Sequence, residues 1–125
     1  MGYRSDVTAV FYCKPDQWPA MKLFVDENFS TVGDLIKDED LHEFTGKYYR
    51  GYKFEVQGWK WYPNYPEVIA FNEFVAKFVE VADDENVKWA YEFARVGENT
   101  DDIEEDQSTY ADGLVYVSRS IETSY

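Results

Sequence analysis

The sequence predicts an α+β domain with a single, mainly antiparallel sheet and helices packed on one face, similar to a split β-α-β arrangement. Segments typical of strands alternate with segments of helical periodicity, in the order β, α, (α), β, α, β, β. Nine phenylalanines, eleven tyrosines and four tryptophans among 125 residues supply enough apolar surface for one core. We therefore expect residues 1–125 to form one domain.

The first strand is expected over residues 7–13, VTAVFYC, where both faces are apolar, as in a central strand. A helix should follow, with Asp16 as its cap and Pro19 in its first turn. Its apolar side chains recur near helical spacing: Trp18, Met21, Val25 and Phe29. A short, weakly amphipathic helix capped by Thr31 is expected within residues 30–46.

Aromatic and β-branched residues dominate residues 47–62, which predicts a long strand or a hairpin. Its alternation changes parity between Val56 and Trp59, so a bulge or turn is expected near Gln57 and Gly58. Residues 68–82 carry apolar side chains at i, i+3, i+4 and i+7, the pattern of an amphipathic helix.

Two further strands are expected near the C-terminus. In residues 87–94 Val87, Trp89, Tyr91 and Phe93 alternate with Lys88, Ala90, Glu92 and Ala94, which predicts a half-buried strand. Residues 114–121, LVYVSRSI, alternate in the same way and predict a last strand. Residues 97–113 should form an acidic loop between the two.

Net charge limits the classes of partner. The formal charge is −13 and the isoelectric point is about 4.3, so the field of the protein repels nucleic-acid phosphates and anionic lipid. We expect no direct nucleic-acid partner and no membrane partner. The single cysteine, Cys13, lies in an apolar stretch, which favours a buried thiol in a reducing compartment, the cytoplasm.

The acidic residues concentrate in one run. Seven of the fifteen residues from Glu98 to Asp112 are acidic, with no Lys, Arg or His among them. Either they form an ordinary solvated surface, or they bind a partner with a basic surface. The candidate partner-binding residues are Glu98, Asp101, Asp102, Glu104, Glu105 and Asp106, with a second patch at Asp38, Glu39 and Asp40.

Other chemistries have weaker support in the sequence. The acidic run lacks the central glycine and the acid spacing of an EF-hand, and the match of residues 50–57 to the RNA-recognition signature fails at Lys53, Glu55 and Gln57. His42 is the only histidine, and it is expected far from Cys13. We therefore expect no enzyme, catalytic residue, metal or cofactor.

Three segments carry a resemblance: MGYRSDV (residues 1–7), WKWYPNYPEV (59–68) and YEFARVGENTDD (91–102). They resemble small uncharacterised bacteriophage and prophage proteins that begin similarly and carry an A-R-x-G-E-N-x-D-D segment. The resemblance implies a phage-encoded accessory protein in the cytoplasm of a bacterial host cell. By analogy, its acidic segments would bind a basic host protein, as a nucleic-acid mimic that inhibits host defence or nucleic-acid machinery.

The alternative hypothesis is a structural or oligomerising module. Aromatic residues are favoured at interface cores, so an exposed aromatic surface would join two copies in a homodimer or join the chain to a partner. The candidate residues are Tyr48, Tyr49, Trp59, Trp61, Tyr62 and Tyr65.

Overall fold

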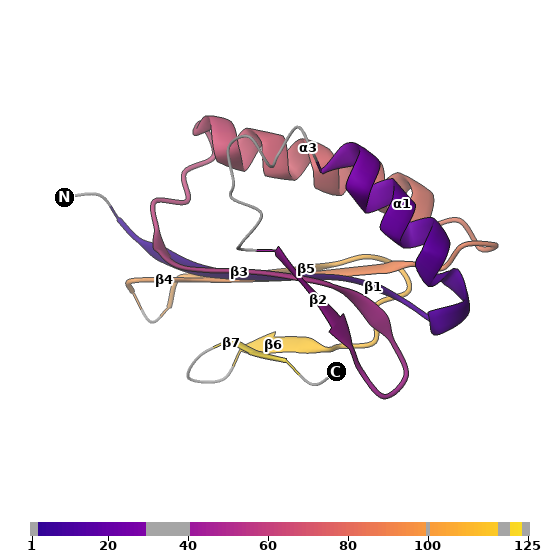
Figure 1. The fold of residues 1–125 in the computed structure, drawn as a ribbon. Helices are drawn as coiled ribbons and strands as arrows, with labels where there is room; N and C mark the ends of the chain where they lie inside the picture. The colour runs from indigo at the N-terminus through magenta and orange to yellow at the C-terminus, as the bar shows by residue number, and fades with distance from the viewer. Residues whose placement is uncertain (1–2, 30–40, 100, 118–120, 124–125) are drawn as a thin grey trace.

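The computed structural model describes residues 3–29, 41–99, 101–117 and 121–123, and its centre is a five-stranded antiparallel sheet (Figure 1). The strands are β1 (Ser5–Cys13), β2 (Leu41–Thr45), β3 (Arg50–Trp59), β4 (Ala90–Gly97) and β5 (Ile103–Gln107). Their order in the sheet is β2-β3-β1-β4-β5. The first four strands, in the order β4-β1-β3-β2, form a split β-α-β arrangement with one helix after β1 and another after β3. The predicted α+β class is confirmed.

The helices α1 (Trp18–Asn28) and α3 (Pro66–Ala82) lie on the same face of the sheet (Figure 1). A 3-10 turn, Pro15–Gln17, precedes α1, so Asp16 lies within that turn, and no side chain caps the helix, contrary to our expectation. The ring of Phe11, at the centre of β1, packs against Phe74 and Phe78 of α3 with centroids 5.2 and 5.1 Å apart. The apolar periodicity of residues 68–82 is confirmed as the buried side of α3.

The opposite face of the sheet carries a second, smaller core. It contains Val10, Tyr12, Ala90, Ala94, Leu114 and Val115. The strands β6 (Val115–Val117) and β7 (Ile121–Thr123) pair as a separate hairpin, which lies below the main sheet in Figure 1. The single strand expected over residues 114–121 is therefore wrong: β6 leaves the main sheet and covers its second apolar face.

The half-buried strand expected over residues 87–94 differs from β4, which begins at Ala90 and is buried on both faces as far as Ala94. Glu92 is 1% exposed, and its neighbours Ala90 and Ala94 are also buried, because residues 111–115 pack over this side of β4. The carboxylate accepts hydrogen bonds from the Tyr12 hydroxyl and from the backbone N–H groups of Leu114 and Val115, the latter two at 2.9 and 3.0 Å. These bonds attach the C-terminal segment to the sheet.

The bulge near residues 57 and 58 is confirmed. Ser5 pairs with Trp59 and Val7 with Val56, so β3 contains one more residue than β1 between these pairs. Gly58 adopts φ +66°, a conformation that glycine adopts without strain. Its N–H donates to Asp6 at 2.9 Å and its carbonyl accepts from Arg4 at 2.7 Å, which fixes the register of the two strands.

Two expected elements differ from the structure. The helix expected over residues 30–46 is wrong at its C-terminal end, because Leu41–Thr45 forms β2 beside β3; residues 30–40 lie outside the described part of the chain. The segment 97–113, expected to be an acidic loop, contains the strand β5, because the backbone of residues 103–107 pairs with β4.

Within the described residues, neither helix has the length and the apolar composition required to cross a lipid bilayer.

Candidate functional site

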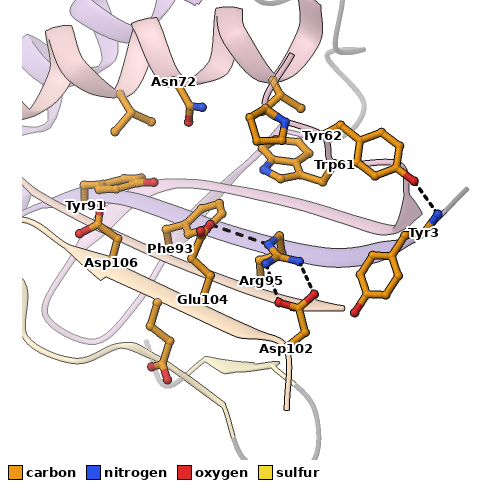
Figure 2. A pocket seen from close by; sticks show the side chains of 14 residues that line it. Tyr3, Trp61, Tyr62, Asn72, Tyr91, Phe93, Arg95, Asp102, Glu104 and Asp106 are labelled. Atoms are coloured by element: carbon orange, nitrogen blue, oxygen red, sulfur yellow. Dashed lines mark hydrogen bonds and ion pairs between the residues drawn. The ribbon is translucent and has the colours of Figure 1, made fainter. Parts of the chain in front are cut away.

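A pocket of about 570 Å³ lies between the N-terminal half of α3 and the strands β4 and β5 (Figure 2). Val68, Asn72 and Val75 of α3 form one wall. The segment 61–63, which leads from β3 to α3, and Tyr3, which precedes β1, close one end. Five segments therefore contribute to the pocket, and they span the chain from residue 3 to residue 106.

Aromatic rings form much of the pocket floor. Tyr91 and Phe93 share the helix-facing side of β4, because successive odd residues of a strand point to the same face. Trp61 lies beside Phe93, with ring centroids 6.5 Å apart (Figure 2). Burial, followed by the nearby charges of Asp106 and Glu104, raises the pKa of Tyr91 far above its usual value. Its hydroxyl is therefore neutral across the physiological range.

Arg95 is the cation of the pocket, and it is paired. Its guanidinium forms two hydrogen bonds with Asp102, at 2.8 and 3.1 Å, and lies 3.8 Å from Glu104 (Figure 2). The hydrogen bond from Arg95, with a second from the Tyr3 hydroxyl, holds the pKa of Asp102 below its usual value. This bidentate geometry fixes both side chains. Asp102 is therefore already engaged within the molecule.

The register of β5 decides which acids face the pocket. Glu104 lies opposite Arg95 and Asp106 lies opposite Phe93, so both share the helix-facing side of the sheet. Glu105 lies opposite Ala94, on the side of the C-terminal hairpin. All three are exposed. On the helix-facing side, one arginine against Asp102, Glu104 and Asp106 leaves the pocket with a net formal charge of −2.

The N-terminal segment, which the sequence did not indicate as part of a site, closes the pocket. Tyr3 donates its backbone N–H to the Tyr62 hydroxyl at 2.6 Å, and its own hydroxyl accepts from the N–H of Asn99 at 3.0 Å. The N–H of Arg4 donates to Glu98 at 2.8 Å. Glu98 thus has a structural role beside its exposed charge. Only the aromatic composition of residues 59–65 hinted at this end of the pocket.

The acidic residues in the described part of the chain do not form a single surface. Glu98, Asp101, Asp102, Glu104, Glu105 and Asp106 gather around β5, at one edge of the sheet. Asp83, after α3, joins them where it accepts the N–H of Thr109 at 3.1 Å. Asp26 and Glu43 lie instead near the opposite edge strand, β2, where both contact Lys22. Asp38, Glu39 and Asp40 lie outside the described residues.

The aromatic residues of the alternative hypothesis do not form a common exposed surface either. Trp61 is 9% exposed, Trp59 packs against the main core, and Tyr62 and Tyr65 are half-buried. Tyr49 donates a hydrogen bond to Asp112 beside the second core. Tyr48 is exposed, but it lies in the β2–β3 turn just before β3 begins, whereas Trp59 lies at the end of β3. Most of these rings stabilise the fold.

In the described part of the chain, the single cysteine and the single histidine are not arranged for catalysis, and no side chains are arranged to bind a metal ion. No three or more His, Cys, Asp and Glu side chains are arranged there to hold a metal ion. Burial raises the pKa of the Cys13 thiol to about 12, so it is not a nucleophile at neutral pH. His42 is exposed on β2, and β3 separates that strand from β1 and Cys13.

No protein-family model matches the chain, and no curated protein has a significantly similar sequence.

Proposed function

We propose that the chain is a phage or prophage accessory protein that binds a basic surface of a host protein through β5 and the adjoining pocket. One observation carries the proposal: β5 is an exposed edge strand that directs Glu104 and Asp106 to the same side as the aromatic floor of the pocket. The resemblance to phage proteins supports the choice of a host partner.

The pocket has the chemistry that a lysine or arginine side chain requires. The apolar stem of either side chain can pack on Trp61, Tyr91 and Phe93, while its charge approaches the carboxylates of Glu104 and Asp106. Because Arg95 is already paired with Asp102, it only partly offsets this negative charge. The net charge of the pocket lining favours cations over anions.

The spacing of the acids supports a nucleic-acid-binding protein as the partner. Glu104 and Asp106 lie on the same face of β5, about 6.8 Å apart along the strand, because residues of an antiparallel strand rise by about 3.4 Å each and alternate between its faces. One strand of DNA carries one phosphate per about 3.4 Å of helix axis, so this spacing corresponds to every second phosphate. A protein with lysines and arginines arranged for a nucleic-acid backbone would therefore meet a commensurate row of charge on this face of β5. Occupation of that surface would inhibit the partner.

The first test is capture from a bacterial lysate with the immobilised protein at low ionic strength, followed by elution with increasing salt. We expect the triple variant E104Q/E105Q/D106N to retain the specific partner at least about tenfold less well than the wild-type chain, because close charge pairs supply much of such binding. Quantitative mass spectrometry of the eluates measures this ratio.

The matched control is D16N/E80Q/E85Q, which removes the same number of exposed charges away from the pocket. It should capture the partner as well as the wild-type chain. Equal losses in both triple variants would show that only the overall charge matters, and an unchanged capture by the β5 variant would refute a role for this strand.

A further inference from the structure

The open edge of β5 has a defined hydrogen-bonding pattern. The N–H of Gly97 donates to the carbonyl of Asp102 at 2.8 Å, and the N–H of Ser108 donates to the carbonyl of Tyr91 at 2.9 Å. In an antiparallel ladder such pairs recur at every second residue, so Glu104 and Asp106 direct their backbone groups toward β4. The intervening residues Ile103, Glu105 and Gln107 direct theirs to the outer edge.

We infer that the host partner binds by strand addition: an extended basic segment pairs with the outer edge of β5 and places alternate lysine or arginine side chains over the pocket. This inference rests on the proposed function and specifies the partner's conformation. In the described part of the chain β5 pairs with β4 alone, and all five of its residues are exposed. Main-chain bonds would supply affinity, and side chains would supply specificity.

Charge determines which strand can be added. A second copy of β5 would set Glu104, Glu105 and Asp106 against the same acids, and directly opposed like charges destabilise strand pairs. A basic strand would set cations there instead. Its residues opposite Glu104 and Asp106 would share their helix-facing side, where the aromatic rings and carboxylates line the pocket. The edge therefore disfavours self-association and favours a basic partner strand.

Glu105 is the central residue of this edge. The outward N–H of Gln107 already donates to the Asp106 side chain at 2.9 Å, and that of Ile103 donates to the carbonyl of Asp101 at 3.2 Å. An added strand would have to replace these two hydrogen bonds with its own. The N–H of Glu105 points outward between them, so it is the donor on which strand addition depends most.

Two substitutions at Glu105 separate strand addition from simple charge attraction. E105Q removes the charge and keeps the N–H, whereas E105P removes both; proline is tolerated on an edge strand where the N–H faces outward. The probe is a short capped peptide that alternates lysine and threonine, with binding measured by calorimetry at low ionic strength. We expect E105P to bind it about tenfold more weakly than E105Q, since proline removes a hydrogen bond and adds a steric obstacle.

A second probe leaves the protein unchanged in case E105P does not fold. The same peptide, N-methylated at every second residue, keeps its charge but loses the donors of one edge, and it should bind the wild-type chain at least about tenfold more weakly. Strand addition would be overturned by any of four results. These are equal binding of both peptides, equal binding by E105P and E105Q, no binding of the unmodified peptide at low ionic strength, and salt-insensitive dimerisation through β5. The first two results would leave electrostatic capture of a host protein intact, and the lysate experiment decides that proposal separately.

Discussion

At the residue scale, Glu92 explains how an acidic side chain can lie inside this protein. A buried carboxylate is tolerated where hydrogen bonds replace its hydration. Glu92 accepts three hydrogen bonds, from the Tyr12 hydroxyl and from two backbone N–H groups. Burial, together with the negative charge of Glu92, raises the pKa of Tyr12 far above the usual tyrosine value, so the Tyr12 hydroxyl is protonated at neutral pH. The N–H of Asp112 donates to the same hydroxyl at 2.7 Å. One carboxylate thus organises residues 112–115.

Substitution E92Q should destabilise the fold by about 1–3 kcal/mol, because the amide nitrogen cannot accept a hydrogen bond and leaves a buried N–H unsatisfied. Urea unfolding at neutral pH measures the change. Y12F removes one donor to Glu92 and the acceptor of the Asp112 N–H, and because water can reach the exposed Asp112 it should cost less, about 1 kcal/mol. Hydrogen exchange at Leu114 and Val115 should accelerate in E92Q. Stability equal to the wild-type value would show that the network contributes little.

Asp102 gives the pH dependence at the same scale. Its pKa in the folded state lies below its ordinary value of 3.8, so the unfolded chain binds the proton first as the pH falls. The stabilisation from Arg95 is complete above about pH 4 to 5 and is lost as the pH falls through the folded-state value. D102N should therefore be less stable than the wild-type chain at pH 7, and the difference should shrink as the pH falls below the ordinary carboxyl value and through the lower folded-state pKa.

The measurement is a pair of urea unfolding curves at each pH. D101N, at an exposed neighbouring position, serves as the control and should show little difference at either pH. If the difference between D102N and the wild-type chain stayed constant with pH, the ion pair with Arg95 would not be its source.

At the element scale, elements with a buried face could be predicted from sequence. The period of α3 and the alternation of Trp89, Tyr91 and Phe93 both reflect packing in the main core. The parity change before Trp59 likewise predicted the bulge. Strand β5 could not be found in this way, because all five residues are exposed and no apolar alternation marks them. The second core was missed because Glu92 has the sequence signature of a solvated position.

The candidate site was likewise only partly predictable from the sequence. Its acids could be identified from composition, since an uninterrupted acidic run must lie at the surface. The pocket could not, because Tyr3, Trp61, Asn72 and Arg95 come from four separate segments and meet only through the sheet order. The pairing of Asp102 with Arg95 was also hidden: the two residues are seven positions apart and meet across the β4–β5 turn.

At the scale of the whole molecule, the net charge of −13 should have opposite effects on stability and on binding. Mutual repulsion of excess like charges destabilises a compact fold, and salt screens it as the Debye length falls from about 30 Å at 0.01 M to about 8 Å at 0.15 M. We therefore expect the melting temperature to rise by about 4 °C, roughly 1 kcal/mol, over this range. Binding of the proposed basic partner should weaken over the same range.

Because the protein should become more stable while binding weakens as salt rises, unfolding cannot cause the weaker binding. The two triple variants then distinguish the effect of overall charge on stability from the effect of local charge on binding. E104Q/E105Q/D106N and D16N/E80Q/E85Q each reduce the net charge from −13 to −10, so both should show a smaller rise in melting temperature with salt than the wild-type chain. Only the β5 variant should lose the salt dependence of partner binding, because only its charges lie at the site. Scanning calorimetry and binding isotherms on the same samples test both expectations. A melting temperature that falls with salt in the wild-type chain would mean that local ion pairs, such as Arg95–Asp102, outweigh the overall repulsion.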